Sequence, residues 1–154
     1  MRLGSHGLDW EVKPFPFKVY PGLEPLRLPA ALPAPVMDTF VALALPPPVA
    51  RPAPLDLERL AAVLFHAAGV SRVKTYPGGS QVHFRAAPST GALYQTEVYV
   101  VAGAVEGLAP GVYHFGPGDF SLRQLRAGDF RAALAHAAAD DAIAGQPASV
   151  VLSA

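Results

Sequence analysis

The 154-residue chain contains no cysteine. This absence excludes a disulfide scaffold, a thiolate zinc site, an iron–sulfur cluster and a cysteine nucleophile. An excess of charge is also missing, because 12 Lys and Arg residues balance 12 Asp and Glu residues. A neutral chain gives no electrostatic reason to expect nucleic acid or an anionic membrane as a partner. With 51% hydrophobic and 16% charged residues, the composition is that of one globular domain.

Long apolar runs are absent as well. No stretch of about 18 apolar residues occurs, so no transmembrane helix is predicted. The N-terminal residues include Asp9 and Glu11 and lack the apolar segment of a secretory signal. We therefore expect a cytoplasmic protein.

Proline, in contrast, is abundant, and 12 of the 17 prolines precede residue 55. Each proline fixes φ and lacks an N–H group, which excludes long helices and central strands from most of residues 1–54. Large apolar side chains nevertheless recur between the prolines: Trp10, Phe15, Phe17, Tyr20, Leu23, Leu26 and Leu28. Residues 1–54 are therefore predicted to form a Pro-rich N-terminal arm that packs on a surface. Its proline-free window, residues 36–45, is long enough for one helix.

From residue 55 onward the hydrophobic pattern predicts an α+β domain. A first helix is expected between Asp56, which caps its start, and Gly69, which ends it, because apolar residues recur at helical spacing. Residues 97–102 predict a buried strand. Residues 111–115 and 120–125 predict a β-hairpin around a four-residue turn.

A second helix and a last strand complete the expected layout. Asp129 is placed to cap this helix, and the side chains expected on its buried face are Phe130, Ala133, Leu134 and Ala137. Residues 148–152 predict the last strand, with an apolar edge that requires a neighbour. The five histidines form no metal-ligand motif, so no metal site is predicted.

The segment from Arg85 to Tyr99 is the best candidate for a functional loop. Pro88 fixes the backbone, Ser89 is placed to cap a helical turn, and Gly91 lets a flat group approach the backbone. Backbone N–H groups near an Arg suit an anionic or carbonyl-rich ligand. A capped turn before a strand explains the same residues without any ligand, and both interpretations stay open.

This segment resembles the nitroreductase family, in particular the signature Arg-x-x-Pro-Ser-x-Gly-Ala-x-Tyr-Pro-x-Glu-x-Tyr of its SagB-type dehydrogenase branch. The matching residues are Arg85, Pro88, Ser89, Gly91, Ala92, Tyr94, Glu97 and Tyr99, while Gln95 replaces the second proline of the signature. Residues 17–21, 55–69 and 108–115 are similar to further motifs of the family. The resemblance thus extends from about residue 15 to the end.

The resemblance implies a nitroreductase-like α+β fold that binds FMN and usually dimerises, with FMN at the subunit interface. The cofactor-binding residues that it implies are Arg85, Pro88, Ser89, Gly91, Ala92 and Tyr94. The flavin would carry the redox chemistry, and no catalytic side chain is assigned. We expect an FMN-dependent oxidoreductase of unknown substrate, present as a homodimer or with a partner chain that supplies the missing half.

Two departures from the family keep an alternative open. Arginines that hold the FMN phosphate in the family correspond to residues 45–52, where only Arg51 is basic. One Arg pairs poorly with a dianionic phosphate. The resemblance also covers only the N-terminal half of a family domain, residues 55–154 being its front half, so the expected fold is truncated. The alternative is a non-catalytic half-domain, or a fragment, that has lost FMN binding and serves as an interaction or dimerisation module.

Overall fold

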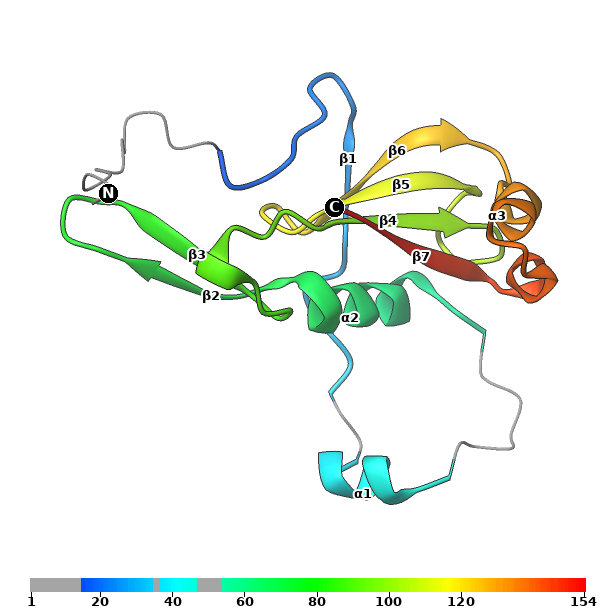
Figure 1. The fold of residues 1–154 in the computed structure, drawn as a ribbon, viewed down its shortest axis with the longest axis horizontal. Coiled ribbons are helices and arrows are strands. Elements are labelled where there is room, and N and C mark those ends of the chain that lie inside the picture. The colour runs from blue at the N-terminus through cyan, green and yellow to red at the C-terminus, as the bar shows by residue number, and fades with distance from the viewer. Residues whose placement is uncertain (1–14, 35–36, 47–53) are drawn as a thin grey trace, which may run out of the picture.

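The computed structural model describes residues 15–34, 37–46 and 54–154. A five-stranded antiparallel sheet with strand order β1-β6-β5-β4-β7 forms its centre (Figure 1). Its strands are β1 (Pro25–Arg27), β4 (Glu97–Ala102), β5 (Gly111–Gly116), β6 (Ser121–Ala127) and β7 (Ala148–Ser153). A separate hairpin, β2 (Val70–Thr75) and β3 (Gln81–Arg85), extends away from one end of this sheet.

Helix α2 (Leu57–Ala68) covers one face of the sheet and forms the core with it. Its buried residues are Leu60, Ala61, Leu64 and Ala68, and those of the sheet include Val98, Val100, Phe115 and Leu122. The helix begins as predicted, because Asp56 Oδ1 accepts a hydrogen bond from the backbone N–H of Arg59 at 2.7 Å. It ends at Gly69, also as predicted.

The central strand and the hairpin are confirmed. Strand β4 has the predicted bounds, and β5 and β6 pair around a turn that follows Gly116. The last strand, β7, pairs with β4 and lies at the edge of the sheet. The strands β2 and β3 were not predicted. β2 is almost entirely exposed, and β3 is mostly half-buried with the charged Arg85 as its one buried residue, so neither strand has a buried apolar face that would reveal it.

The remaining helices are short. Helix α3 (Arg131–Ala138) starts after Asp129, whose carboxylate accepts from the backbone N–H of Arg131 at 3.0 Å. Its predicted buried face is wrong, because Ala133 and Ala137 are exposed and Ala135 is the buried residue. A 3-10 turn, η2 (Asp141–Gly145), connects it to β7.

The described part of the N-terminal arm joins the sheet rather than standing apart from it. Strand β1 pairs with β6 at an edge position, where a proline such as Pro25 costs no central hydrogen bond. Leu28 then enters the core. Helix α1 (Thr39–Ala44) fills part of the predicted 36–45 window and buries none of its residues. Trp10 and Arg51 lie outside the described residues.

Within the part that the structure describes, no helix is both long and apolar enough to cross a membrane.

Candidate functional site

The predicted functional loop connects β3 to β4 and contains the 3-10 turn η1 (Thr90–Ala92). Three of its residues have left-handed backbone conformations: Gly91 at φ +64°, Ala92 at +53° and Tyr94 at +48°. For a residue with a side chain this conformation costs about 1–2 kcal/mol. Such strain concentrates at ligand-binding segments, so the loop geometry agrees with a functional role.

Two side chains hold this loop in shape. Ser89 was expected to cap the helical turn, but its hydroxyl instead accepts a hydrogen bond from the backbone N–H of Tyr94 at 2.9 Å. The Tyr94 hydroxyl in turn accepts from the backbone N–H of Arg85 at 3.0 Å. Ser89 and Tyr94 therefore close the loop against the end of β3, independently of any ligand.

Arg85 connects the loop to the N-terminal arm. Its guanidinium lies 5.4 Å from the ring centroid of Phe17 and 4.9 Å from that of Tyr94, and it donates to the carbonyl of Pro16 at 3.1 Å. The residue is only 8% exposed, and burial lowers the pKa of its guanidinium, against the opposing effect of Glu97. Arg85 Nε has no hydrogen-bond partner in the described part of the chain. One cation is thus buried beside the loop and only partly paired.

A cavity of about 430 Å³ lies between the loop, the end of α2 and strands β4 and β7. We call it the loop cavity. Its lining residues are Ala67, Ala68, Arg85, Ala87, Pro88, Ser89, Thr90, Tyr94, Gln95, Thr96, Val98, Val150 and Leu152. Its walls are mainly apolar, with hydroxyl and amide groups contributed by the loop. This combination is common in pockets for small organic ligands, whose volumes are about 300–1,000 Å³.

The six predicted cofactor-binding residues do not all meet in this cavity. Arg85, Pro88, Ser89 and Tyr94 line it. The other two, Gly91 and Ala92, line a second hollow of about 390 Å³, on the side of the loop that faces β3 and the arm. Arg85 and Tyr94 therefore face both sides of the loop, whereas Pro88 and Ser89 line one side and Gly91 and Ala92 the other.

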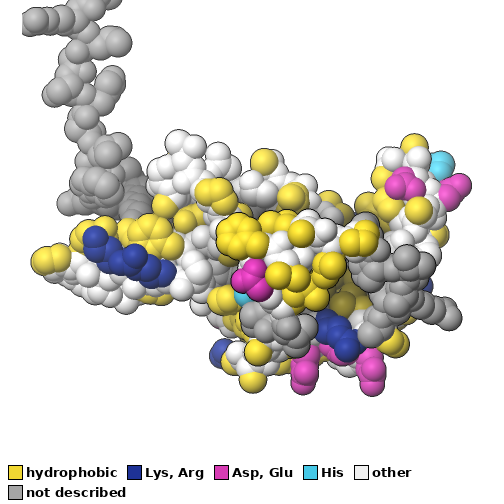
Figure 2. All heavy atoms as spheres, turned by 90° about the horizontal axis from the view of Figure 1, so that it is seen from below, with side chains coloured by type: hydrophobic (Ala, Val, Ile, Leu, Met, Phe, Trp, Pro, Cys, Tyr) yellow, Lys and Arg dark blue, Asp and Glu magenta, His cyan; other side chains and the backbone are white. Residues whose placement is uncertain are grey.

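Sequence reasoning did not find the residues that α2 and β7 contribute to the loop cavity. Val150 and Leu152 are 46% and 65% exposed, large fractions for apolar residues of a strand. Hydrophobic side chains also gather at the centre of the face seen in Figure 2, on the side where α1 and α2 lie. The exposed last strand was the one available signal, because its apolar edge was expected to need a neighbour. No group of three or more possible metal ligands occurs among the described residues.

The sheet, helix α2 and the β3–β4 loop together form a nitroreductase-like fold. A solved structure from Anabaena variabilis, of a protein assigned as a nitroreductase, matches 96% of this chain with a TM-score of 0.70 and 29% sequence identity. This chain spans 27% of the length of that protein. No family model matches the chain, and no curated protein matches it.

Proposed function

We propose that this chain acts in an FMN-dependent oxidoreductase of the nitroreductase family, SagB-type branch, with the flavin ring in the loop cavity. The observation that carries the proposal is the loop cavity itself, which the signature loop forms within a nitroreductase-like fold. When bound, FMN would supply the redox chemistry, and the chain would bind and orient it.

The lining of the loop cavity fits a flat, largely apolar ring with a polar edge. Ala68, Val98 and Val150 provide apolar wall, and Ser89 and Thr90 offer polar groups at the loop side. The Ser89–Tyr94 hydrogen bond keeps this wall in place, because it fixes both ends of the loop segment that contains the left-handed residues Gly91 and Ala92. The chain's own contribution is therefore a preformed slot, which lowers the entropic cost of binding.

The phosphate group is matched less well than the ring. Among the residues described as lining the loop cavity, Arg85 is the one cation, and its guanidinium already contacts Phe17, Tyr94 and the Pro16 carbonyl. Arg85 would therefore act on the ring's polar edge through its charge, and the loop cavity would leave the phosphate without a second cation. We therefore expect the ring to contribute most of the affinity of this chain for FMN.

A titration of the purified chain with FMN, followed by quenching of flavin fluorescence, tests this proposal. A67W places a large side chain in the loop cavity from an exposed helix position, so it should weaken binding at least about tenfold. H66W is the matched control, because His66 is exposed on the same helix but does not line the cavity. Riboflavin should bind within about threefold of FMN. Absence of saturable quenching, or equal weakening by both variants, would refute the proposed ring site.

A second candidate function, a non-catalytic interaction module, is favoured by a different observation. Phe40 and Leu43 of α1 are 82% and 78% exposed, and β7 leaves one edge of the sheet unpaired within the described residues. Apolar surface of this kind supports association with a second copy or a partner chain. Sedimentation analysis of the chain gives its oligomeric state, and the FMN titration above shows whether it binds flavin. A dimer that binds no flavin supports this function, and a flavin-binding monomer contradicts it.

A further inference from the structure

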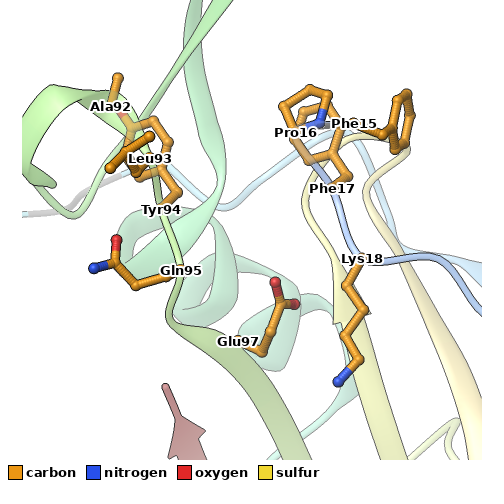
Figure 3. A pocket seen from close by; sticks show the side chains of 9 residues that line it. All are labelled: Phe15, Pro16, Phe17, Lys18, Ala92, Leu93, Tyr94, Gln95 and Glu97. Atoms are coloured by element: carbon orange, nitrogen blue, oxygen red, sulfur yellow. The ribbon is translucent and has the colours of Figure 1, made fainter. Parts of the chain in front are cut away.

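A third cavity, of about 350 Å³, lies between the N-terminal arm and the end of the functional loop that leads into β4 (Figure 3). We call it the arm cavity. Its lining residues are Phe15, Pro16, Phe17, Lys18, Ala92, Leu93, Tyr94, Gln95 and Glu97. Tyr94 and Gln95 also line the loop cavity, so this short segment separates the two. The arm cavity contains two charged side chains, Lys18 from the arm and Glu97 from β4.

Glu97 is held by a histidine from the interior of the protein. His114 Nε2 lies 2.7 Å from Glu97 Oε2, and the His114 side chain is completely buried. The Glu97 side chain keeps 17% of its surface exposed. Its second oxygen, Oε1, has no hydrogen-bond partner in the part of the chain that the structure describes. One carboxylate oxygen is thus fixed, and the other is available at the cavity.

Lys18 is held by two tyrosines. Its ammonium donates to the Tyr99 hydroxyl at 2.9 Å, and the Tyr20 hydroxyl lies 3.1 Å from that of Tyr99. The hydrogen bond to Tyr99, together with the nearby Tyr20 hydroxyl, raises the pKa of Lys18 above its ordinary value, so the side chain stays charged. The ring of Tyr20 also packs 5.0 Å from that of His114. An ammonium has three donors, and these contacts leave part of them available.

Lys18 and Glu97 do not form an ion pair with each other. Among the ion pairs of the described residues, none joins Lys18 to Glu97, although both line the same cavity. Lys18 lies on the arm and is anchored by Tyr99 of β4, whereas Glu97 lies on β4 and is anchored by His114 of β5. Phe15 and Leu93, which also line the arm cavity, are 70% and 71% exposed. A separated ammonium and carboxylate beside apolar surface is complementary to a ligand with the same three features.

We propose that the arm cavity binds a zwitterionic ligand of the amino-acid class with an apolar side chain. Glu97 receives the ligand's ammonium group and Lys18 its carboxylate. Phe15 and Leu93 cover its apolar side chain. This site does not depend on the proposed flavin site, because the two cavities share only the Tyr94–Gln95 wall and binding is measured without FMN.

Three probes test the proposal by isothermal titration of the purified chain. L-phenylalanine carries all three features, N-acetyl-L-phenylalanine lacks the ammonium, and L-phenylalaninamide lacks the carboxylate. We expect saturable binding of L-phenylalanine and about tenfold weaker binding of each blocked compound, because each loses a charge-assisted contact. No saturable binding of L-phenylalanine, or equal binding of the three compounds, overturns the proposal.

Two variants test which charged group of the ligand is bound by Glu97 and which by Lys18. E97Q should weaken L-phenylalanine and L-phenylalaninamide about tenfold and leave N-acetyl-L-phenylalanine unchanged. K18M should weaken L-phenylalanine and N-acetyl-L-phenylalanine and leave the amide unchanged. K74M is the matched control, because Lys74 is an exposed lysine of β2 that does not line the cavity. Binding that is insensitive to E97Q and K18M overturns the assignment, and the comparison of the three compounds on the unmodified chain does not depend on how the variants fold.

Discussion

Replacement of Gly91 by valine tests the role of the functional loop through its backbone. Gly91 has φ +64°, and a Cβ atom added there would lie 3.7 Å from Leu93 Cγ, an ordinary contact distance. Space is therefore available, and the cost is that of a left-handed conformation for a residue with a side chain, about 1–2 kcal/mol. Domains are typically stable by about 5–15 kcal/mol, so we expect G91V to stay folded.

The loop can avoid this strain only by changing conformation. A return of residue 91 to negative φ moves Tyr94 relative to Ser89, and their 2.9 Å hydrogen bond is then lost. Both residues line the loop cavity, so its wall is displaced. We expect FMN affinity to fall at least about tenfold in G91V, a change of about 1.4 kcal/mol.

The matched control is G78V. Gly78 has φ +94° and no atom within 4 Å of an added Cβ, so valine brings similar backbone strain to the exposed β2–β3 turn, which does not line the cavity. Urea unfolding should show a similar loss of stability in both variants. Fluorescence titration with FMN should then show a loss of affinity in G91V alone. Equal FMN affinity in the two variants would refute the role assigned to the loop.

Three further predictions concern the scaffold. L64A should destabilise the chain by about 2–5 kcal/mol in urea unfolding, because Leu64 is fully buried between α2 and the sheet; a loss below about 1 kcal/mol would contradict this packing. D56A should cost about 1 kcal/mol by removing the α2 cap, and an unchanged midpoint would argue against the cap. Burial raises the pKa of Asp119, but hydrogen bonds from Arg123 and Ser121 outweigh it and lower the pKa below its ordinary 3.8. The ionised carboxylate therefore stabilises the fold above that pH and loses this effect as the pH falls, so the advantage of wild type over D119N should shrink from pH 5 to pH 2; parallel curves would contradict it.

Elements with local sequence signals could be predicted from the sequence. Helix α2 follows from its apolar spacing and from Asp56 and Gly69 at its ends, and β4 follows from its β-branched and aromatic residues. The β2–β3 hairpin was missed because both strands lie outside the main sheet and neither buries an apolar residue. Strand β1 was missed because proline lacks an N–H group and is rare in strands. Proline is tolerated in a strand at the edge of a sheet, which is where β1 lies.

The candidate site was only partly predictable, because some of its residues come from distant parts of the sequence. The signature loop is contiguous in sequence, so Ser89 and Tyr94 could be named as site residues, although the hydrogen bond between them could not. Val150 enters the loop cavity only through the pairing of β7 with β4. The contact of Lys18 with Tyr99 joins residues 81 positions apart and requires the arm to cross the sheet. No local pattern carries that information.

The location of bound FMN tests the central claim most directly. Backbone amide signals of the isotope-labelled chain should be followed by two-dimensional NMR while FMN is added. The account predicts saturable shifts at Ser89, Thr90, Val150 and Leu152, the loop and β7 sides of the loop cavity. Signals of the distant β2–β3 turn should stay unchanged. Saturable shifts confined to residues outside the loop cavity, or no saturable shifts at all, would contradict it.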